Sequence, residues 1–318
     1  MQAKTIALVG ATGFVGRHLL ARLAADGHNL RVLARSRERN RDLLVMPTVT
    51  VIKADVYDPD TLAGHFRGCD AVINLVGILN ESRRDSFQRA HVDLPRLILQ
   101  ACRVSGVRRL LHMSSLKASA SDGPSKYLRS KGQAEDLLRK ESGADVDVTV
   151  FCPSLIFGPG DSSTNRFADI LRLPMPIQPL PRANARFAPV YVGDVVEAFA
   201  RALADRGTAN KTYQLCGPQV FSMRELLAFL ATELGLKRTI VGMPDSIARL
   251  SARIMEWLPG KPFSRDNYQS LTVHSICEAD GMGELGIRPT SLASIAPGYL
   301  AAKTERARLS IFRKAAGR

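Results

Sequence analysis

The chain has 318 residues, of which 45% are hydrophobic and 23% are charged, and its formal net charge is +14. This composition suffices for a large core and is typical of a soluble globular protein. No apolar run reaches the roughly 18 residues that cross a bilayer, so a membrane-spanning class is not expected.

The basic charge has two explanations. One is an anionic partner such as a dinucleotide, acidic lipid or nucleic acid, and the other is a solubilising surface. Nucleic acid ranks last, because no known RNA or DNA motif occurs and basic residues do not alternate with aromatic ones. The C-terminal segment 301–318 is basic, and we expect it either to be a frayed terminus or to contact anionic lipid or a larger complex.

Cysteine and histidine patterns bear on cofactors and compartment. The five cysteines are widely spaced and include no CxxC pair, and no metal-binding motif is found among the six histidines. We therefore expect neither a disulfide framework nor a metal site, and a reducing compartment. Because "MQAKTIALVG" has no signal-peptide pattern and runs into a strand, we expect a cytoplasmic protein.

The first half of the chain alternates short apolar runs with amphipathic segments. The runs are apolar throughout, which is typical of parallel strands buried on both faces. Strands are predicted at 4–10, 30–35, 49–55, 70–77, 107–115 and 147–154, and helices at 14–27, 86–105 and 125–141. This alternation predicts an α/β fold with a Rossmann-type doubly wound parallel sheet.

The second half predicts a smaller lobe. Segments 157–167 and 173–187 are rich in Pro, Gly and Asn and are expected to be loops. A strand and helix follow at 189–205, a strand at 212–217, and mostly helices from about 222. The predicted domains are a dinucleotide-binding domain at 1–155, to which 185–217 returns, a mostly helical substrate lobe at 156–184 and 218–300, and a basic tail at 301–318.

A glycine-rich turn follows the first strand. "VGATGFVG" places Gly10, Gly13 and Gly16 between a strand and a helix. Such glycines permit a tight turn, close approach to a pyrophosphate and helix–strand packing. We therefore predict that this segment, which also contains Thr12, Phe14 and Val15, binds a dinucleotide; the alternative is a glycine-rich turn without a ligand.

The end of the second strand bears on which dinucleotide binds. An NAD site usually has an acidic residue there, whereas this strand ends in Arg35, Ser36 and Arg37, and 29–37 contains no acid. An arginine can pair with a 2′-phosphate and stack on adenine. NADP(H) is therefore preferred and NAD(H) remains open; the alternative is that these arginines form a solvated loop.

Ordered motifs along the chain resemble a known family. "GATGFVG", "ADVYD", "INLVG", "HMSS", "YLRSK", "FCPSLIFGPGD" and "PVYVGDVVEA" occur in that order. The set resembles the short-chain dehydrogenase/reductase superfamily, in the extended or atypical branch of NAD-dependent epimerases and dehydratases. Within that branch it is most similar to the group formed by the nucleotide-binding accessory subunit of respiratory complex I and its bacterial relatives.

The resemblance implies further cofactor contacts. Asp55 and Val56 match the adenine-contacting acid and its neighbour. The loop after the fourth strand, which passes the ribose, is matched by Leu75, Val76 and Gly77. Pro153 and Ser154 match the segment beside the nicotinamide.

Tyr127 and Lys131 form a candidate catalytic pair, since residues at i and i+4 share one helix face. A tyrosine titrates at about pH 10, and a nearby ammonium favours the phenolate. Tyr127 would then exchange a proton with a carbonyl or alcohol while hydride moves to or from nicotinamide. The resemblance implies that the lysine also holds the nicotinamide ribose and that Ser115, with Ser114 as the alternative, binds the substrate oxygen.

Two departures from the family pattern concern the substrate side. Lys117 is unusual after the serine, and "HVDLP" at 91–95 replaces the common Asn-Val-x-Gly-Thr. Two hypotheses therefore stay open. One is an oxidoreductase or epimerase/dehydratase-type enzyme acting on a carbonyl, an alcohol or a nucleotide-sugar-like substrate. The other is a catalytically weak or inactive accessory or assembly subunit of a respiratory NADH:quinone oxidoreductase complex, peripheral to the inner membrane. A homodimer is compatible with both.

Other candidate sites lie in the second half. The resemblance places Asn165, Arg166 and Arg186 on the substrate side, where an arginine would bind an anionic group; the alternative is that they anchor loops. At 246–260, Ile247, Leu250, Ile254, Trp257 and Leu258 form one helical stripe. We favour an ordinary amphipathic helix covering the small lobe over a membrane-surface or partner helix.

Overall fold

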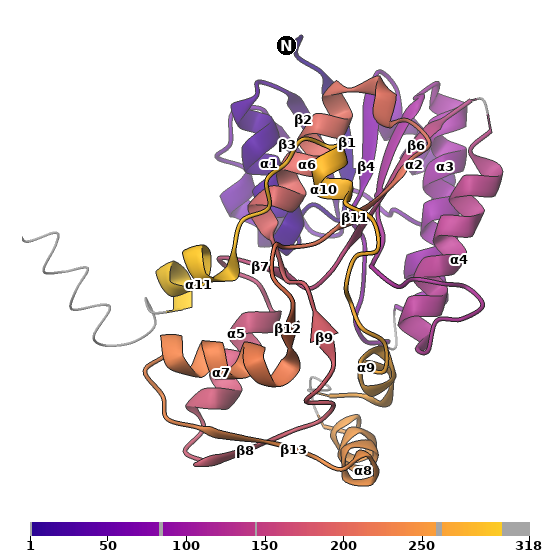
Figure 1. Cartoon of the computed structure of the whole chain (residues 1–318). Coiled ribbons are helices and arrows are strands. Elements are labelled where there is room, and N and C mark those ends of the chain that lie inside the picture. The colour runs from indigo at the N-terminus through magenta and orange to yellow at the C-terminus, as the bar shows by residue number, and fades with distance from the viewer. Residues whose placement is uncertain (1, 83–84, 144, 259–262, 301–318) are drawn as a thin grey trace, which may run out of the picture. The chain divides into compact units, whose positions relative to one another are not determined.

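The computed structural model describes residues 2–82, 85–143, 145–258 and 263–300 (Figure 1). The chain divides into two compact units. The first comprises Met1–Pro153, Gly193–Leu215 and Glu278–Ile287, and the second comprises Ser154–Val192, Cys216–Cys277 and Arg288–Arg318. The described helices include none that is long and apolar enough to span a membrane.

A seven-stranded sheet forms the centre of the first unit, in the order β11-β6-β5-β4-β1-β2-β3. All neighbouring strands are parallel, which confirms the predicted Rossmann-type fold. The strands are β1 (Thr5–Val9), β2 (Asn29–Ala34), β3 (Val49–Lys53), β4 (Ala71–Asn74), β5 (Arg109–Met113), β6 (Asp147–Pro153) and β11 (Thr212–Leu215).

Helices pack on both faces of this sheet, and Figure 1 shows α1 and α6 on one side and α3 and α4 on the other. The helices of the unit are α1 (Phe14–Ala25), α2 (Pro59–Phe66), α3 (Leu94–Ser105), α4 (Lys126–Glu141), α6 (Val192–Ala204, whose first residue belongs to the second unit) and α10 (Gly281–Glu284). Shorter helical segments are η1 (Glu38–Leu43), η2 (Gln88–Asp93) and η3 (Arg206–Thr208). Because the Ser125 side chain accepts a hydrogen bond from the Leu128 amide, α4 begins just before Tyr127.

A late segment also belongs to the first unit. Glu278–Ile287 lies there, although the sequence analysis assigned 218–300 to the other lobe. The amides of Glu278 and Ala279 donate to Gln214 Oε1 of β11. A Cβ added at Gly281 would lie 2.5 Å from the Gln214 carbonyl oxygen. This close backbone packing depends on residues far apart in the sequence.

The second unit contains three two-stranded sheets and several helices. β7 (Ile156–Phe157) pairs with β10 (Val190–Tyr191), β8 (Ile177–Leu180) with β13 (Thr239–Gly242), and β9 (Arg186–Phe187) with β12 (Phe221–Ser222). Its helices are α5 (Ser163–Arg172), α7 (Met223–Glu233), α8 (Asp245–Met255), α9 (Arg265–Ser270) and α11 (Leu292–Leu300). The segments expected to be loops therefore contain α5, β8 and β9, because each strand is stabilised by a partner distant in sequence.

One sequence-based expectation about cysteine is wrong. Cys216 and Cys277 form a disulfide across 61 positions of sequence. Cys69, Cys102 and Cys152 are buried and reduced. The pairing follows from two chain segments that meet only in the folded second unit, and spacing along the sequence carries no signal for it.

The favoured interpretation of the 246–260 stripe is also wrong. Ile247, Leu250, Ile254, Trp257 and Leu258 are all exposed, and α8 instead packs through the small side chains of Ala248 and Ala252. Residues 259 and 260 of this segment, and the basic tail 301–318, lie outside the described residues.

Candidate functional site

The glycine turn lies where β1 meets α1. Gly10 has φ +84°, and a Cβ there would lie 2.7 Å from the Val76 amide nitrogen. At Gly16 a Cβ would lie 2.3 Å from the Ala11 Cα. The turn therefore requires glycine at both positions, which keeps the loop after β4 and the start of α1 close to the end of β1.

The position of this turn in the sheet favours an anionic ligand. β1 has β2 on one side and β4 on the other, so the strand order reverses here, and ligands of open α/β sheets bind at such a point. Within the described chain no side chain caps the N-terminus of α1, and its first turn has no acidic residue. Its amides and dipole thus suit a pyrophosphate.

The other predicted residues of the turn have structural contacts. Val15 is buried, and the Phe14 ring packs edge-on against His18 at 5.4 Å between centroids. The Thr12 carbonyl accepts a hydrogen bond from Arg17 Nε at 3.1 Å. The contacts made by Phe14 and Thr12 support the first turn of α1.

At the end of β2, Arg35 and Ser36 contact acidic side chains. Arg35 Nη1 lies 3.0 Å from Asp85 Oδ2, yet the side chain is 78% exposed. Ser36 Oγ donates to Glu38 Oε2 at 2.8 Å, so an acid that lies just beyond the predicted strand end holds this hydroxyl. Arg37 is exposed.

The loops after β3 and β4 hold further predicted cofactor residues of the first unit, and Pro153 is the last residue of β6. Asp55 is exposed and accepts from the Tyr57 amide at 3.0 Å, whereas Val56 is buried. The Val76 amide donates to Asn74 Oδ1 at 3.1 Å, which fixes the turn after β4. Leu75 and Pro153 are buried.

Lys131 projects from α4 between the ends of two strands. Its Nζ donates to the Met113 carbonyl oxygen at 3.1 Å and to the Val76 carbonyl oxygen at 3.3 Å, and a Cβ at Gly77 would lie 3.4 Å from it. Burial lowers the pKa of Lys131 to about 8, while the Glu135 carboxylate opposes that shift. An ammonium has three donors, so one is not used by the described protein groups.

Tyr127 lies one turn before Lys131 on the same helix. Its ring packs edge-on against His91 at 5.4 Å and against Phe87 at 6.1 Å between centroids. The side chain is half-buried. The structure thus holds the predicted pair on α4, with the lysine buried and the tyrosine at the edge of an aromatic cluster.

His91 is a residue of this site that the sequence analysis did not assign. Its Nε2 accepts from the Ile78 amide at 3.0 Å, so Nδ1 carries the proton and donates to Ser130 Oγ at 2.8 Å. Ser130 Oγ in turn donates to the Tyr127 carbonyl oxygen at 2.8 Å. Burial, reinforced by Lys131, lowers the pKa of His91 to about 2, so it is neutral. The sequence signal for His91 is that it begins "HVDLP", where the family usually has Asn-Val-x-Gly-Thr.

The two candidate serines differ in their surroundings. Ser114 is buried and donates to Glu135 Oε1, which also accepts from Cys152 Sγ at 3.4 Å. Ser115 is half-buried, and its hydroxyl makes only a long 3.5 Å contact with the Leu116 carbonyl oxygen. Ser114 is thus committed to the protein interior, and Ser115 is the better placed of the two to bind a substrate.

Four predicted residues belong to the second unit. Ser154 Oγ donates to the Ser275 carbonyl oxygen at 2.7 Å. Asn165 Nδ2 donates to the Asp161 carbonyl oxygen at 2.7 Å, which supports a loop-anchoring role. The Arg186 amide donates to His274 Nδ1 at 3.2 Å, and the Arg166 amide donates to the Ser162 carbonyl oxygen at 3.2 Å within α5.

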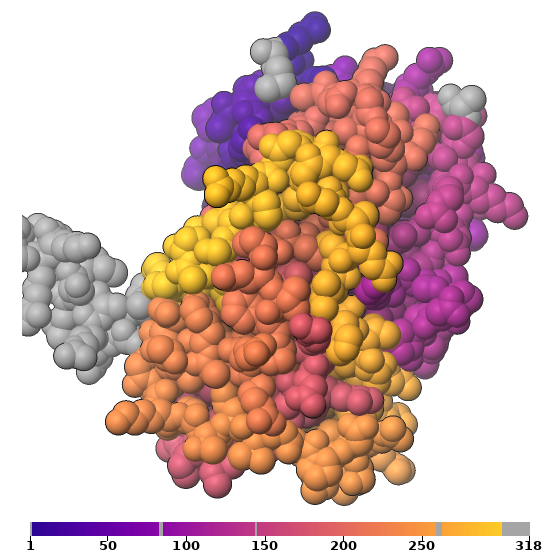
Figure 2. Space-filling view, in the orientation of Figure 1, coloured from indigo at the N-terminus to yellow at the C-terminus, as the bar shows by residue number. Residues whose placement is uncertain are grey.

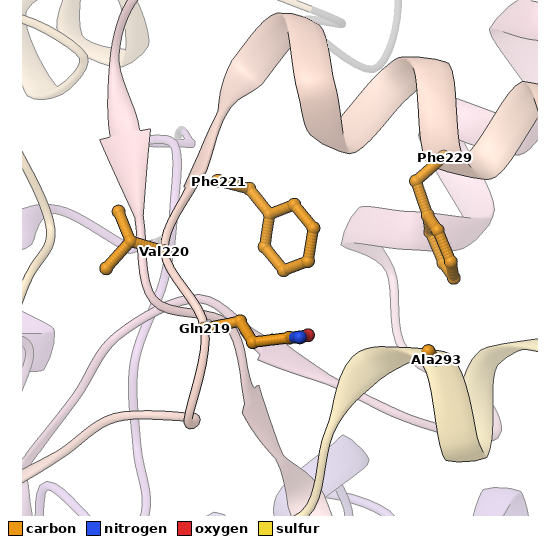
Figure 3. Close-up of a pocket in the computed structure, with 5 residues that line it drawn as sticks. All are labelled: Gln219, Val220, Phe221, Phe229 and Ala293. Carbon is orange, nitrogen blue, oxygen red and sulfur yellow. The ribbon is translucent and has the colours of Figure 1, made fainter.

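The second unit also has an open concavity of about 440 Å³ (Figure 3). Figure 3 shows the ring of Phe221 facing that of Phe229, with the side chain of Gln219 next to Phe221. None of the predicted site residues lines it. Its wall is largely apolar, so it lacks the convergent polar groups typical of an active site.

Comparison with known proteins agrees with this geometry. Residues 6–216 match the model of the "NAD dependent epimerase/dehydratase family". The chain is 32% identical over 274 residues to NADH dehydrogenase [ubiquinone] 1 alpha subcomplex subunit 9 of Arabidopsis thaliana, covering 84% of this chain and 67% of the relative. It is 30% identical over 259 residues to the ceramide reductase of Caulobacter vibrioides, covering 79% and 78%.

Solved structures share the fold. A nucleoside-diphosphate-sugar epimerase from Staphylococcus aureus superposes with a TM-score of 0.74 at 19% identity, covering 91% of this chain and 98% of the other. The glycine turn at the strand reversal, the Tyr–Lys helix and the family match over two thirds of the sequence lead to one conclusion. This chain is a member of the NAD dependent epimerase/dehydratase family.

Proposed function

We propose that the protein is an NADP(H)-dependent oxidoreductase that interconverts a carbonyl and an alcohol. The observation that carries this proposal is the position of Lys131. Its buried amine lies beside Gly77 at the ends of β4 and β5, one turn from Tyr127, with one donor left for a ligand. A surface lysine without a functional role would be exposed, rather than buried with its amine hydrogen-bonded to two backbone carbonyls.

The chain's own groups then have distinct roles. The α1 N-terminus and glycine turn bind the pyrophosphate, and Lys131 donates to the nicotinamide ribose. When bound, the dinucleotide supplies or accepts hydride. Tyr127 gives its proton to the substrate oxygen in reduction, and its phenolate removes that proton in oxidation. The Lys131 ammonium stabilises the phenolate. Ser115 donates to the same oxygen and orients it.

NADP(H) rather than NAD(H) is favoured by the end of β2. Arg37 is exposed just after β2, and Arg35 is also solvent-accessible although it is paired with Asp85. Two guanidinium groups suit a 2′-phosphate better than a diol. The acid at Glu38 is engaged with Ser36.

The test is Tyr127→Phe, screened against carbonyl and nucleotide-sugar substrates. We expect turnover to fall by at least roughly 100-fold while NADPH affinity changes little, because only the acid/base group is removed. Tyr213→Phe is the control, since it deletes a hydroxyl from β11 at the sheet edge. Equal turnover in the Tyr127 variant would disprove the catalytic role.

A second candidate is an accessory subunit of a respiratory NADH:quinone oxidoreductase, peripheral to the inner membrane. The similarity to the Arabidopsis subunit supports it. So does the loop after Ser115, where Lys117 departs from the family pattern and forms an ion pair with Glu278. On this view NADPH stabilises the fold without being oxidised. Co-purification with respiratory membranes, together with no turnover of any carbonyl, would favour this function.

A further inference from the structure

We propose that α8 docks the protein onto an anionic lipid surface. The α8 outer face consists of Ile247, Leu250, Ile254, Trp257 and Leu258. These side chains are 52%, 58%, 58%, 86% and 50% exposed. They recur at helical spacing, so they form one continuous apolar stripe on α8 and the turn that follows it. This proposal goes beyond the reaction proposed above and does not depend on it.

The helix is packed the opposite way round from an ordinary surface helix. Its buried side consists of Ala248 and Ala252, both 0% exposed, which lie against Tyr268. Ordinary surface helices bury large apolar residues and expose polar ones. Here the large residues face solvent, although removing such side chains from water is favourable. We therefore expect this face to contact an apolar environment outside the chain, such as the interface of a lipid bilayer.

Charges around α8 select an anionic surface. Both acids at its ends are already paired, Asp245 with Arg182 at 3.4 Å and Glu256 with Arg265 at 2.8 Å. Arg253 is exposed, next to Ile254 in sequence. A stripe of apolar residues bordered by exposed arginine is typical of helices that lie in the headgroup region of acidic membranes.

Further exposed apolar residues occur on the strand pair β8–β13, the second strand of which precedes α8. β13 leads through Met243 and Pro244 into α8, and Figure 1 shows α8, β8 and β13 at the same end of the second unit. Ile177 of β8 and Val241 of β13 are 57% and 46% exposed. In Figure 2 the orange spheres of this region lie at the surface. Eleven of the fifteen large hydrophobic residues exposed in the described chain belong to the second unit.

A lipid surface fits better than a second copy of the chain. Each copy carries a formal charge of +14, so self-association through an arginine-bordered face meets repulsion. α8 has 11 residues and is about 16 Å long, too short to span a bilayer and suited to lying in its interface. Trp257 follows its last turn, and tryptophan prefers that interface.

Trp257 makes the proposal directly testable, because it is the chain's single tryptophan. Full-length protein would be titrated with vesicles of phosphatidylcholine alone or mixed with phosphatidylglycerol, while tryptophan emission and vesicle co-sedimentation are recorded. We expect the emission maximum to shift to the blue by roughly 10 nm with the anionic vesicles only. High salt should weaken the binding.

Two variants distinguish an effect specific to the α8 outer face from the effect of adding one negative charge elsewhere on the surface. Leu250→Glu should reduce vesicle binding at least roughly tenfold, because it places a carboxylate in the apolar stripe. Val104→Glu is the matched control, since Val104 of α3 is 72% exposed outside this face, and it should bind almost as well as the parent protein.

Three results would overturn the proposal. One is binding without any change in Trp257 emission, as expected if the basic residues beyond 300 bind alone. Another is unaltered binding of Leu250→Glu. The last is a blue shift that grows with protein concentration in the absence of lipid and accompanies dimer formation. Circular dichroism of both variants checks that the fold is retained.

Discussion

Lys131 Nζ donates a hydrogen bond to the carbonyl oxygen of Val76 over 3.3 Å. This bond joins α4 to the loop after β4, and Gly10 packs against the same Val76. The glycine turn and the lysine are therefore coupled through one short loop. A change at either end should therefore affect dinucleotide binding.

Gly10→Ala should weaken NADPH binding by at least roughly tenfold and destabilise the protein, because the new Cβ would lie 2.7 Å from the Val76 amide. Gly27→Ala is a matched control. Gly27 has a similar φ of +80°, but no atom lies within 4 Å of its added Cβ. It should cost about 1 kcal/mol of backbone strain and leave affinity unchanged. Fluorescence titration measures the NADPH affinity of both variants, and urea unfolding measures their stability. Equal affinities would show that the close packing of Gly10 against Val76 is not needed for binding.

Arg37→Glu should lower NADPH affinity by at least roughly tenfold and leave NADH affinity almost unchanged, because only NADPH carries the 2′-phosphate. Arg39→Glu, an equally exposed neighbour with the same charge change, is the control. Parallel titrations of the parent and both variants with NADPH and NADH give the ratio of the two affinities for each protein. If the two variants lose NADPH affinity equally, the loss comes from the change in net charge and not from a contact with the 2′-phosphate. The NADP(H) assignment then fails.

Lys131→Met should change how stability depends on pH. In the folded protein the pKa of Lys131 is lowered from 10.5 to about 8, so the unfolded chain binds this proton more tightly. Between about pH 8 and 10.5 the unfolded state therefore holds more protons, and stability contributed by this residue rises with pH, by about 3 kcal/mol over the whole window. Below pH 8 both states are protonated and the penalty is constant.

The measurement is urea unfolding of parent and Lys131→Met at pH 7, 8 and 9. The difference in unfolding free energy between the two proteins should favour the parent increasingly above pH 8. Lys140→Met, at the exposed end of α4, controls for loss of a lysine and should show no such trend. A constant difference between parent and Lys131→Met would mean that the amine is not perturbed by burial.

Reduction of the Cys216–Cys277 disulfide should destabilise the protein. Its cysteines are 61 positions apart, and loop-closure entropy predicts a loss of about 4 kcal/mol. Cys216→Ala, Cys277→Ala and the double variant should be equally destabilised under oxidising conditions, since one bond is lost in each. Thermal unfolding with and without reductant tests this. A double variant clearly less stable than either single one would show separate packing roles instead.

Sequence alone determined the first unit's architecture and indicated the glycine turn. Uniformly apolar strands such as Thr5–Val9 specify a sheet buried on both faces, and Gly10 and Gly16 mark where no side chain fits. Helical spacing puts Tyr127 and Lys131 on one helix face, and the family resemblance implies their roles. The apolar strands, the glycines and the helical spacing are local signals, so periodicity and residue type suffice to find them.

Only the tertiary structure decided the contacts between distant segments. His91 accepts a hydrogen bond from the Ile78 amide, Ser114 donates one to Glu135, and Cys216 forms a disulfide with Cys277. The spacing of these residues along the sequence does not predict any of the three contacts. The stripe at Leu250 was recognised, but which side of α8 is buried depended on Ala248 and Ala252 finding Tyr268. An amphipathic pattern shows that a helix has two faces, whereas the partners available in the folded chain select the one that packs.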